Sequence, residues 1–84
     1  MTVTVRLYAS LPDKLAQRGG QRVQAGSKLD LELPDASCLV DLLSLLRLRR
    51  EEVLTAFVNG RQRDLDHILA PGDEVGFFPP IAGG

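Results

Sequence analysis

The last six residues of the chain combine a stiff approach with very small side chains at the tip. Pro79-Pro80 comes first, Ile81 and Ala82 follow, and the sequence closes on Gly83-Gly84. Each proline ring fixes its own φ at about −65° and favours an extended conformation in the residue before it. The two glycines have no side chains and fit through a narrow channel without steric conflict. The pattern predicts an arm that presents the carboxylate of Gly84 to the active site of another protein.

A carboxylate at the end of such an arm must be activated before it can react. It is a poor acyl donor at neutral pH, because its leaving group would be an oxide. Attack of the carboxylate on the α-phosphate of ATP makes an acyl-adenylate. A partner's persulfide or thiolate can then replace the adenylate with sulfur at Gly84. The domain would supply only position and a docking surface. The simple alternative is a frayed terminus in which the glycines have no role.

The other residue types that carry chemistry lack companions in the sequence. His67 is the only histidine and Cys38 the only cysteine, which argues against a metal cluster and against a serine, histidine and aspartate triad. We expect a structural or capping role for His67 and a helix-packing role for Cys38. Gly19-Gly20 has neither the lysine nor the spacing of a phosphate-binding loop. No bound metal or cofactor is therefore predicted.

Composition limits what the chain can do alone. The sequence has 84 residues, of which 44% are hydrophobic and 25% charged, with a formal net charge of −1, as expected for one small soluble domain. Arg61 and Arg63 lie close to Asp64 and Asp66, which argues against nucleic-acid binding. No apolar stretch approaches the roughly 20 residues that cross a bilayer, and a single cysteine suits a reducing compartment. We therefore expect a cytoplasmic protein that binds neither nucleic acid nor membrane.

Two strands are predicted in the first part of the chain. Apolar and polar residues alternate over residues 3–8 and again over residues 28–33, the period-2 pattern of half-buried strands. Pro12 is expected to end the first strand and Pro34 the second. Residues 13–27 are a polar connection with a short helical turn expected at about residues 14–18.

A helix is predicted after the second strand. Its expected buried stripe has the spacing i, i+3, i+4, i+7 and consists of Leu39, Leu42, Leu43 and Leu46. Ser37 is the expected N-cap, because its hydroxyl can accept a hydrogen bond from an unpaired amide of the first turn. The opposite, solvated side is expected to hold Asp41, Ser44 and Arg47.

Two further strands complete the predicted fold. Residues 54–58 form the third, and Asn59-Gly60 supplies the positive φ angles of a tight hairpin turn. Pro71-Gly72-Asp73 marks another turn before a last strand at residues 74–78. The order predicts an α+β fold of the β-grasp type, a mixed sheet of four to five strands covered by one main helix. The domain is expected to span residues 1–78, followed by an extended, flexible tail at 79–84.

The carboxyl-terminal motif also resembles a known family. Phe77-Phe78-Pro79-Pro80-Ile81-Ala82-Gly83-Gly84, preceded by Pro71-Gly72-Asp73-Glu74-Val75, closely resembles the end of the MoaD/ThiS family of ubiquitin-like sulfur carriers. Residues 3–9 and 37–46 are similar to the first strand and the helix of that family, and residues 57–60 and 65–69 to its hairpin region. The proline pair before the diglycine resembles MoaD, the small subunit of molybdopterin synthase, more than the thiamine-pathway carrier ThiS.

The resemblance implies a role in molybdenum or tungsten cofactor biosynthesis. It implies that a MoeB-like enzyme adenylates Gly84 with ATP, that a donor protein supplies sulfur for a thiocarboxylate there, and that a MoaE-like large subunit receives it. Gly83 would be the slim residue before the sulfur bearer. Gln62 stands where MoaD usually has an apolar docking residue. The implied partner-binding residues are Tyr8, Gln62, Phe78, Pro79, Pro80, Ile81 and Ala82.

Other functions fit the same residues. A sulfur carrier for thiamine, cysteine or tRNA thiolation would use the same terminus. So would a ubiquitin-like modifier, in which activated Gly84 is joined to lysines of other proteins. A β-grasp binding module with an incidental tail would need no free Gly84 at all. A sulfur carrier would gain a thiocarboxylate on a chain of unchanged length, whereas a modifier would form a ladder of conjugates. A binding module would keep its activity when Gly84 is deleted.

Overall fold

The computed structural model describes residues 1–80, which fold into one mixed five-stranded sheet with helices on one side. The strands lie in the order β2-β1-β5-β3-β4. Their bounds are β1 (Thr2–Leu7), β2 (Leu29–Glu32), β3 (Thr55–Val58), β4 (Arg61–Gln62) and β5 (Glu74–Phe78). The helices are α1 (Leu11–Gln17), α2 (Leu39–Leu45) and a short 3-10 helix, η1 (Arg50–Glu52).

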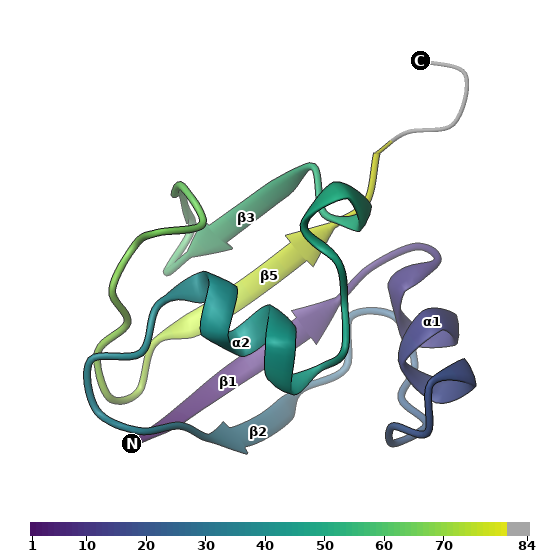
Figure 1. Ribbon diagram of the computed structural model, residues 1–84, viewed down its shortest axis with the longest axis horizontal. Coiled ribbons are helices and arrows are strands. Elements are labelled where there is room, and N and C mark those ends of the chain that lie inside the picture. The colour runs from purple at the N-terminus through teal and green to yellow at the C-terminus, as the bar shows by residue number, and fades with distance from the viewer. Residues whose placement is uncertain (81–84) are drawn as a thin grey trace.

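The central pair of the sheet joins the first strand to the last. β1 and β5 run parallel, with Leu7 opposite Phe77, and the other three pairings are antiparallel. Figure 1 shows β1 and β5 side by side in the middle of the sheet, with α2 crossing in front of them. This is the ubiquitin-like β-grasp arrangement that the sequence predicts, and the fold prediction is confirmed.

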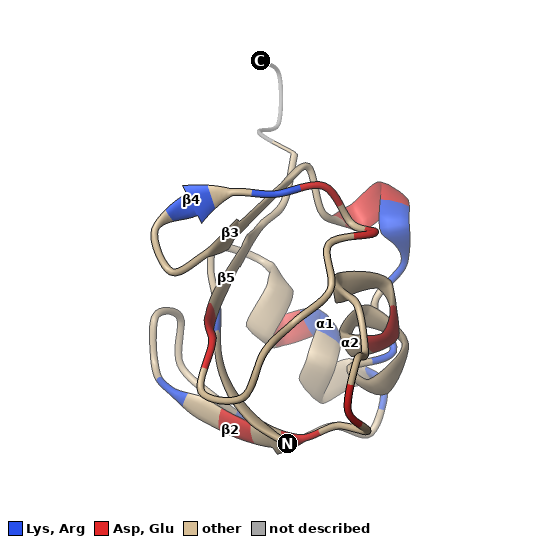
Figure 2. Ribbon diagram, turned by 90° about the vertical axis from the view of Figure 1, so that its left-hand side faces the viewer, with Lys and Arg blue, Asp and Glu red and all other residues tan. Residues whose placement is uncertain are grey.

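The hydrophobic core lies between the sheet and the helices. Figure 2 shows the two layers edge on, with the strands on one side and α1 and α2 on the other. Every second strand residue points into this layer, as the alternation predicts: the fully buried side chains include Val3, Val5, Leu7 and Phe77. The predicted helix stripe is buried too, at Leu39, Leu42, Leu43 and Leu46. No helix formed by residues 1–80 covers the opposite face of the sheet, which we call the open face.

The connection after β1 differs from the sequence prediction. The strand ends at Leu7, not at Pro12, and α1 begins at Leu11, earlier than the helical turn expected at residues 14–18. Pro12 lies in the first turn of α1, where a missing N–H costs no hydrogen bond and the fixed φ suits a helix. Pro12 therefore starts a helix here and does not end a strand.

The predicted cap of α2 is wrong by one residue. Cys38 occupies the N-cap position, and its backbone N–H donates to the Asp41 carboxylate at 2.9 Å. The Ser37 hydroxyl points backward instead and donates to the carbonyl oxygen of Pro34 at 2.7 Å. The carboxylate of Asp41 close to the helix start is favourable, because it faces the partial positive charge of the first turn.

An ion-pair cluster joins α1 to η1 on the helical side of the sheet. Arg18 donates to both carboxylate oxygens of Glu52, at 2.6 and 2.7 Å, and Lys14 lies 3.2 Å from the same group. The Arg49 backbone N–H also donates to Glu52, at 2.9 Å. The Arg18 guanidinium, helped by the Arg49 amide, holds the pKa of Glu52 well below its usual range.

Among residues 1–80, no helix is long and apolar enough to cross a membrane.

Candidate functional site: an aromatic groove beside the tail

Tyr8 and Phe78 stack on the open face of the sheet. Tyr8 follows β1 directly, and Phe78 is the last residue of β5, so the parallel register brings them together. Their ring centroids are 4.4 Å apart and their planes differ by 1°. The Tyr8 backbone N–H donates to the Phe77 carbonyl at 3.2 Å, which fixes the two chain segments at this point. The sequence predicted both residues for a docking face, and the structure places them in direct contact.

A third aromatic residue, Phe57, extends the stack and was not among the predicted site residues. Its ring meets Phe78 edge to face, with centroids 5.7 Å apart and an interplanar angle of 82°. β3 brings it there, since Phe57 pairs with Gly76 of β5. The two-residue turn at Asn59-Gly60 was the available signal, because such a turn puts Phe57 opposite Gln62 and on the same face.

Gly76 makes room for the stack. It lies on β5 between Phe57 and the ring of Tyr8, and a Cβ at this position would stand 3.4 Å from Tyr8 Cε2 and 3.8 Å from Phe78 Cε2. A larger side chain would occupy the space that the rings use. A small residue at position 76 therefore lets the Tyr8 ring pack against the sheet.

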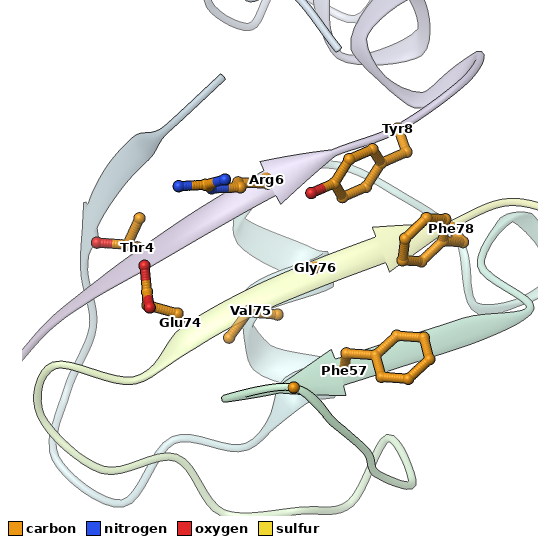
Figure 3. Close-up of a pocket in the computed structure, with 9 residues that line it drawn as sticks. Thr4, Arg6, Tyr8, Phe57, Glu74, Val75, Gly76 and Phe78 are labelled. Atoms are coloured by element: carbon orange, nitrogen blue, oxygen red, sulfur yellow. The ribbon is translucent and has the colours of Figure 1, made fainter. Parts of the chain in front are cut away.

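These residues line a groove of about 430 Å³ on the open face. Figure 3 shows its two ends, with Tyr8, Phe57 and Phe78 at the end where β1 and β5 finish, and Thr4, Arg6 and Glu74 at the other. We call it the aromatic groove. Phe78 is 37% exposed, so the aromatic end of the groove is accessible from solvent.

Gln62 lies at the edge of this face. It is exposed on β4 and pairs with Phe57, so it stands next to the aromatic end without lining the groove. A polar residue here borders the apolar surface, as in the rim of a protein interface. Its predicted role in partner binding stays a prediction.

The aromatic groove adjoins the start of the tail. The last hydrogen bond to β5 runs from the Leu54 backbone N–H to the Phe78 carbonyl at 2.9 Å. Pro79 and Pro80 have no N–H and cannot continue the ladder, and Pro80 is exposed. Sheet pairing therefore ends where the arm begins. The remaining predicted site residues, Ile81, Ala82, Gly83 and Gly84, lie outside the described residues.

The other candidates form no second chemical site. In the described part of the chain, no group of three or more histidine, cysteine, aspartate or glutamate residues is arranged to hold a metal ion. Cys38 is half-buried at the start of α2, and His67 is half-buried in a loop where its carbonyl accepts from Leu39. Cys38 is the N-cap of α2 and not a residue packed within the helix, and the predicted structural role of His67 stays a prediction.

A family comparison agrees with this geometry. The model of the ThiS family matches residues 14–84, which include α2, the hairpin, β5 and the sequence of the tail. The chain belongs to the ThiS family. No curated protein sequence matches it.

Solved structures similar to this ThiS-family chain share its whole fold. The small archaeal modifier protein SAMP1 from Haloferax volcanii is 21% identical, with a TM-score of 0.70 and full coverage of both chains. A putative molybdopterin converting factor, subunit 1, from Pyrococcus furiosus is 25% identical, with a TM-score of 0.68 over 96% of this chain and 99% of that one. Subunit 1 or 2 in a complex of the molybdopterin-converting factor from Helicobacter pylori is 22% identical, with a TM-score of 0.58 and full coverage of both chains.

Proposed function

We propose that this protein is a sulfur carrier that bears a thiocarboxylate on Gly84 and donates sulfur as the small subunit of molybdopterin synthase. The observation that carries the proposal is the position of the Tyr8–Phe78 stack at the residue where β5 ends and the Pro79-Pro80 arm begins. A partner that binds the aromatic groove would thereby hold the base of the tail and direct its tip. Membership of the ThiS family supports the same role.

The proposed chemistry starts from the carboxylate of Gly84. A carboxylate oxygen attacks the α-phosphorus of ATP, pyrophosphate leaves, and an acyl-adenylate forms. The terminal sulfur of a donor persulfide then attacks the acyl carbon and AMP leaves. A second thiol attacks the remaining sulfur–sulfur bond, which yields the thiocarboxylate and a disulfide. The enzymes that bind the tail would perform each step, while this chain contributes the reacting group and its orientation.

The aromatic groove suits the docking role better than a catalytic one. Its charged residues, Arg6 and Glu74, stand away from Phe78, the last strand residue before the tail. Its aromatic end offers apolar surface that a partner can desolvate, which is where binding energy concentrates in protein interfaces. The molybdopterin pathway is supported by the proline pair before Ile81 and by the likeness to the factor subunit from Pyrococcus furiosus.

Intact-mass analysis tests the carrier proposal. The full chain is incubated with ATP, a MoeB-like activating enzyme and a persulfide donor, and the expected product is a chain of unchanged length in which sulfur replaces one oxygen. A chain lacking Gly84 is the matched control and should gain no sulfur while its circular dichroism spectrum stays the same. Covalent conjugates to other proteins would assign the chain to the modifiers, and an unchanged mass would contradict the proposal.

The pathway is tested separately with the thiocarboxylated chain. Mixed with a MoaE-like large subunit and a pterin precursor, it should support molybdopterin formation in proportion to the sulfur supplied. The same preparation offered to a thiazole synthase is the comparison. Transfer only in the second reaction would preserve the carrier chemistry and reject the molybdopterin assignment.

A further inference from the structure

A second groove lies on the other side of the β3–β4 hairpin. It has a volume of about 390 Å³ and shares no lining residue with the aromatic groove. Its lining consists of Val58, Asn59, Arg61, Arg63, His67, Ile68, Ala70 and Asp73. Phe57 and Val58 are neighbours on β3 and point to opposite faces, so the two grooves are separated by the sheet itself. We call the second one the arginine groove.

The charged residues that line the arginine groove are two arginines and one aspartate. Asp73 is already satisfied, because its carboxylate accepts from Asn59 Nδ2 at 2.9 Å and from the Ala70 backbone N–H at 2.8 Å. Asn59 uses its other side-chain atom to accept from the Glu74 N–H at 2.9 Å. Within residues 1–80, Arg61 and Arg63 form no ion pair. The groove therefore presents two guanidinium groups that form no ion pair, whereas the Asp73 carboxylate is hydrogen-bonded within the loop and Asp64 and Asp66 do not line the groove.

The spacing of the two arginines favours an extended ligand. They are two residues apart on one edge of the hairpin, and the Arg63 backbone N–H donates to the Ala56 carbonyl at 2.9 Å, so the strand geometry continues through both. Alternate strand residues stand roughly 6.6 Å apart on one face. Carboxylates at alternate positions of an extended peptide have the same spacing. β4 is also an edge strand of the sheet, and Figure 2 shows it in the blue that marks lysine and arginine.

An exposed aliphatic residue stands beside the arginines. Ile68 is 62% exposed, yet its backbone is held by a bridge to Cys38 and by the flanking bond from Leu69 N–H to the Ser37 carbonyl at 2.8 Å. A fixed apolar side chain next to cations can bind an aliphatic side chain at little ordering cost. An inorganic anion would not use it. Single-stranded nucleic acid is also disfavoured, because the groove contains no phenylalanine, tyrosine or tryptophan ring on which a base could stack, and His67 is the one smaller ring in its lining.

We propose that the arginine groove is a second docking surface, which binds an extended acidic segment of a partner protein with carboxylates at alternate positions and an aliphatic residue nearby. Charge complementarity to Arg61 and Arg63 identifies the acidic residues, and Ile68 identifies the aliphatic one. Because the groove shares no lining residue with the aromatic groove, one partner could hold the carrier here while another binds the aromatic groove.

The test uses nuclear magnetic resonance on the full, isotope-labelled chain. The probe is a synthetic peptide, acetyl-Glu-Thr-Glu-Thr-Leu-amide, and a second peptide has lysine in place of both glutamates. The glutamate peptide should shift the amide signals around Arg61, Arg63 and Ile68, and added salt should weaken it. No shifts there, equal shifts with the lysine peptide, or tighter binding of an oligothymidine would overturn the proposal.

Matched variants make the test specific. The double change Arg61→Glu and Arg63→Glu should weaken peptide binding roughly tenfold or more, because both contacts become repulsive. Arg22→Glu changes an exposed arginine outside the groove. Although it also makes the net charge more negative, it should leave binding within about twofold. Ile68→Ala should weaken it less than the double change. The amide spectrum itself reports whether each variant is folded, and an equal loss in Arg22→Glu would reject a defined site.

Discussion

Tyr8 and Phe78 stack with their planes 1° apart, although they come from opposite ends of the chain. Their contact is possible because β1 and β5 are parallel neighbours, so the carboxyl ends of both strands lie side by side. The stack therefore reports on the correct pairing of the two central strands. It also puts apolar surface beside the first residue of the tail.

Phe78→Ala should weaken binding to the proposed partner, a MoaE-like large subunit, by about 2 kcal/mol, or roughly thirtyfold in Kd, because it removes the central ring of the aromatic groove. Tyr8→Phe keeps both rings and should bind almost normally. Leu45→Ala is the control, since Leu45 is 50% exposed on α2, on the other side of the sheet. Isothermal titration calorimetry with the large subunit measures all three. An equal loss in Leu45→Ala would rule out the aromatic groove as the interface.

Gly76→Val should displace the Tyr8 ring, whereas Gly76→Ala should be accommodated. The alanine Cβ is 3.4 Å from the ring, but the two extra methyl groups of valine have no room. Overpacking costs about 1–3 kcal/mol and outweighs the strand preference of valine, which is worth at most about 1 kcal/mol. Near-ultraviolet circular dichroism of the single tyrosine and urea unfolding measure the two effects. A valine variant with an unchanged tyrosine signal would contradict the model of the groove.

Glu52→Gln should lower the free energy of unfolding at pH 7 by about 1 kcal/mol, because the ion pair with the partly exposed Arg18 is lost. The folded-state pKa of Glu52 is depressed, so its stabilising effect is present above the unfolded pKa of about 4.3 and is lost as the pH falls toward the folded pKa. The variant and the natural chain should therefore converge in acid. Urea unfolding between pH 7 and pH 3 measures this. Glu51→Gln, at an exposed neighbour, should show no such convergence.

Asn59→Ala should destabilise the chain more than Asn59→Gly. Asn59 has φ 52°, and its side chain bonds to Asp73 and to the Glu74 N–H. Both variants lose the two hydrogen bonds, at about 1 kcal/mol each, but only alanine adds about 1–2 kcal/mol of left-handed backbone strain. Urea unfolding should rank natural chain, glycine and alanine in that order. Equal losses would show that the turn relaxes when the side chain is removed.

Local patterns predicted the elements of this fold well. Alternation located β1, β2 and β5, and the leucine spacing located α2, because each pattern follows directly from which side of an element is buried; β3 was placed before the Asn59-Gly60 turn. Elements with ambiguous signals were placed less well. Pro12 suits either the end of a strand or the first turn of a helix, and Ser37 and Cys38 compete for one cap. Only tertiary contacts decide between such neighbours.

The candidate site was predictable in part. Tyr8 and Phe78 were predicted, whereas Phe57 and Gly76 were missed, because the site depends on the register between strands that are distant in sequence. Periodicity assigns a residue to one face of its own strand, but it does not say which strand lies alongside. The predictions for Ile81, Ala82, Gly83 and Gly84 still rest on sequence.

The central place of β5 has a consequence for synthesis. Because β5 inserts between β1 and β3, the sheet cannot close until the residues just before the tail have left the ribosome. A prematurely terminated chain would lack the middle of its sheet as well as Gly84, the proposed site of activation. An activating enzyme that recognises the folded domain would thus ignore truncated products, and translation itself would set the moment at which the carrier becomes competent.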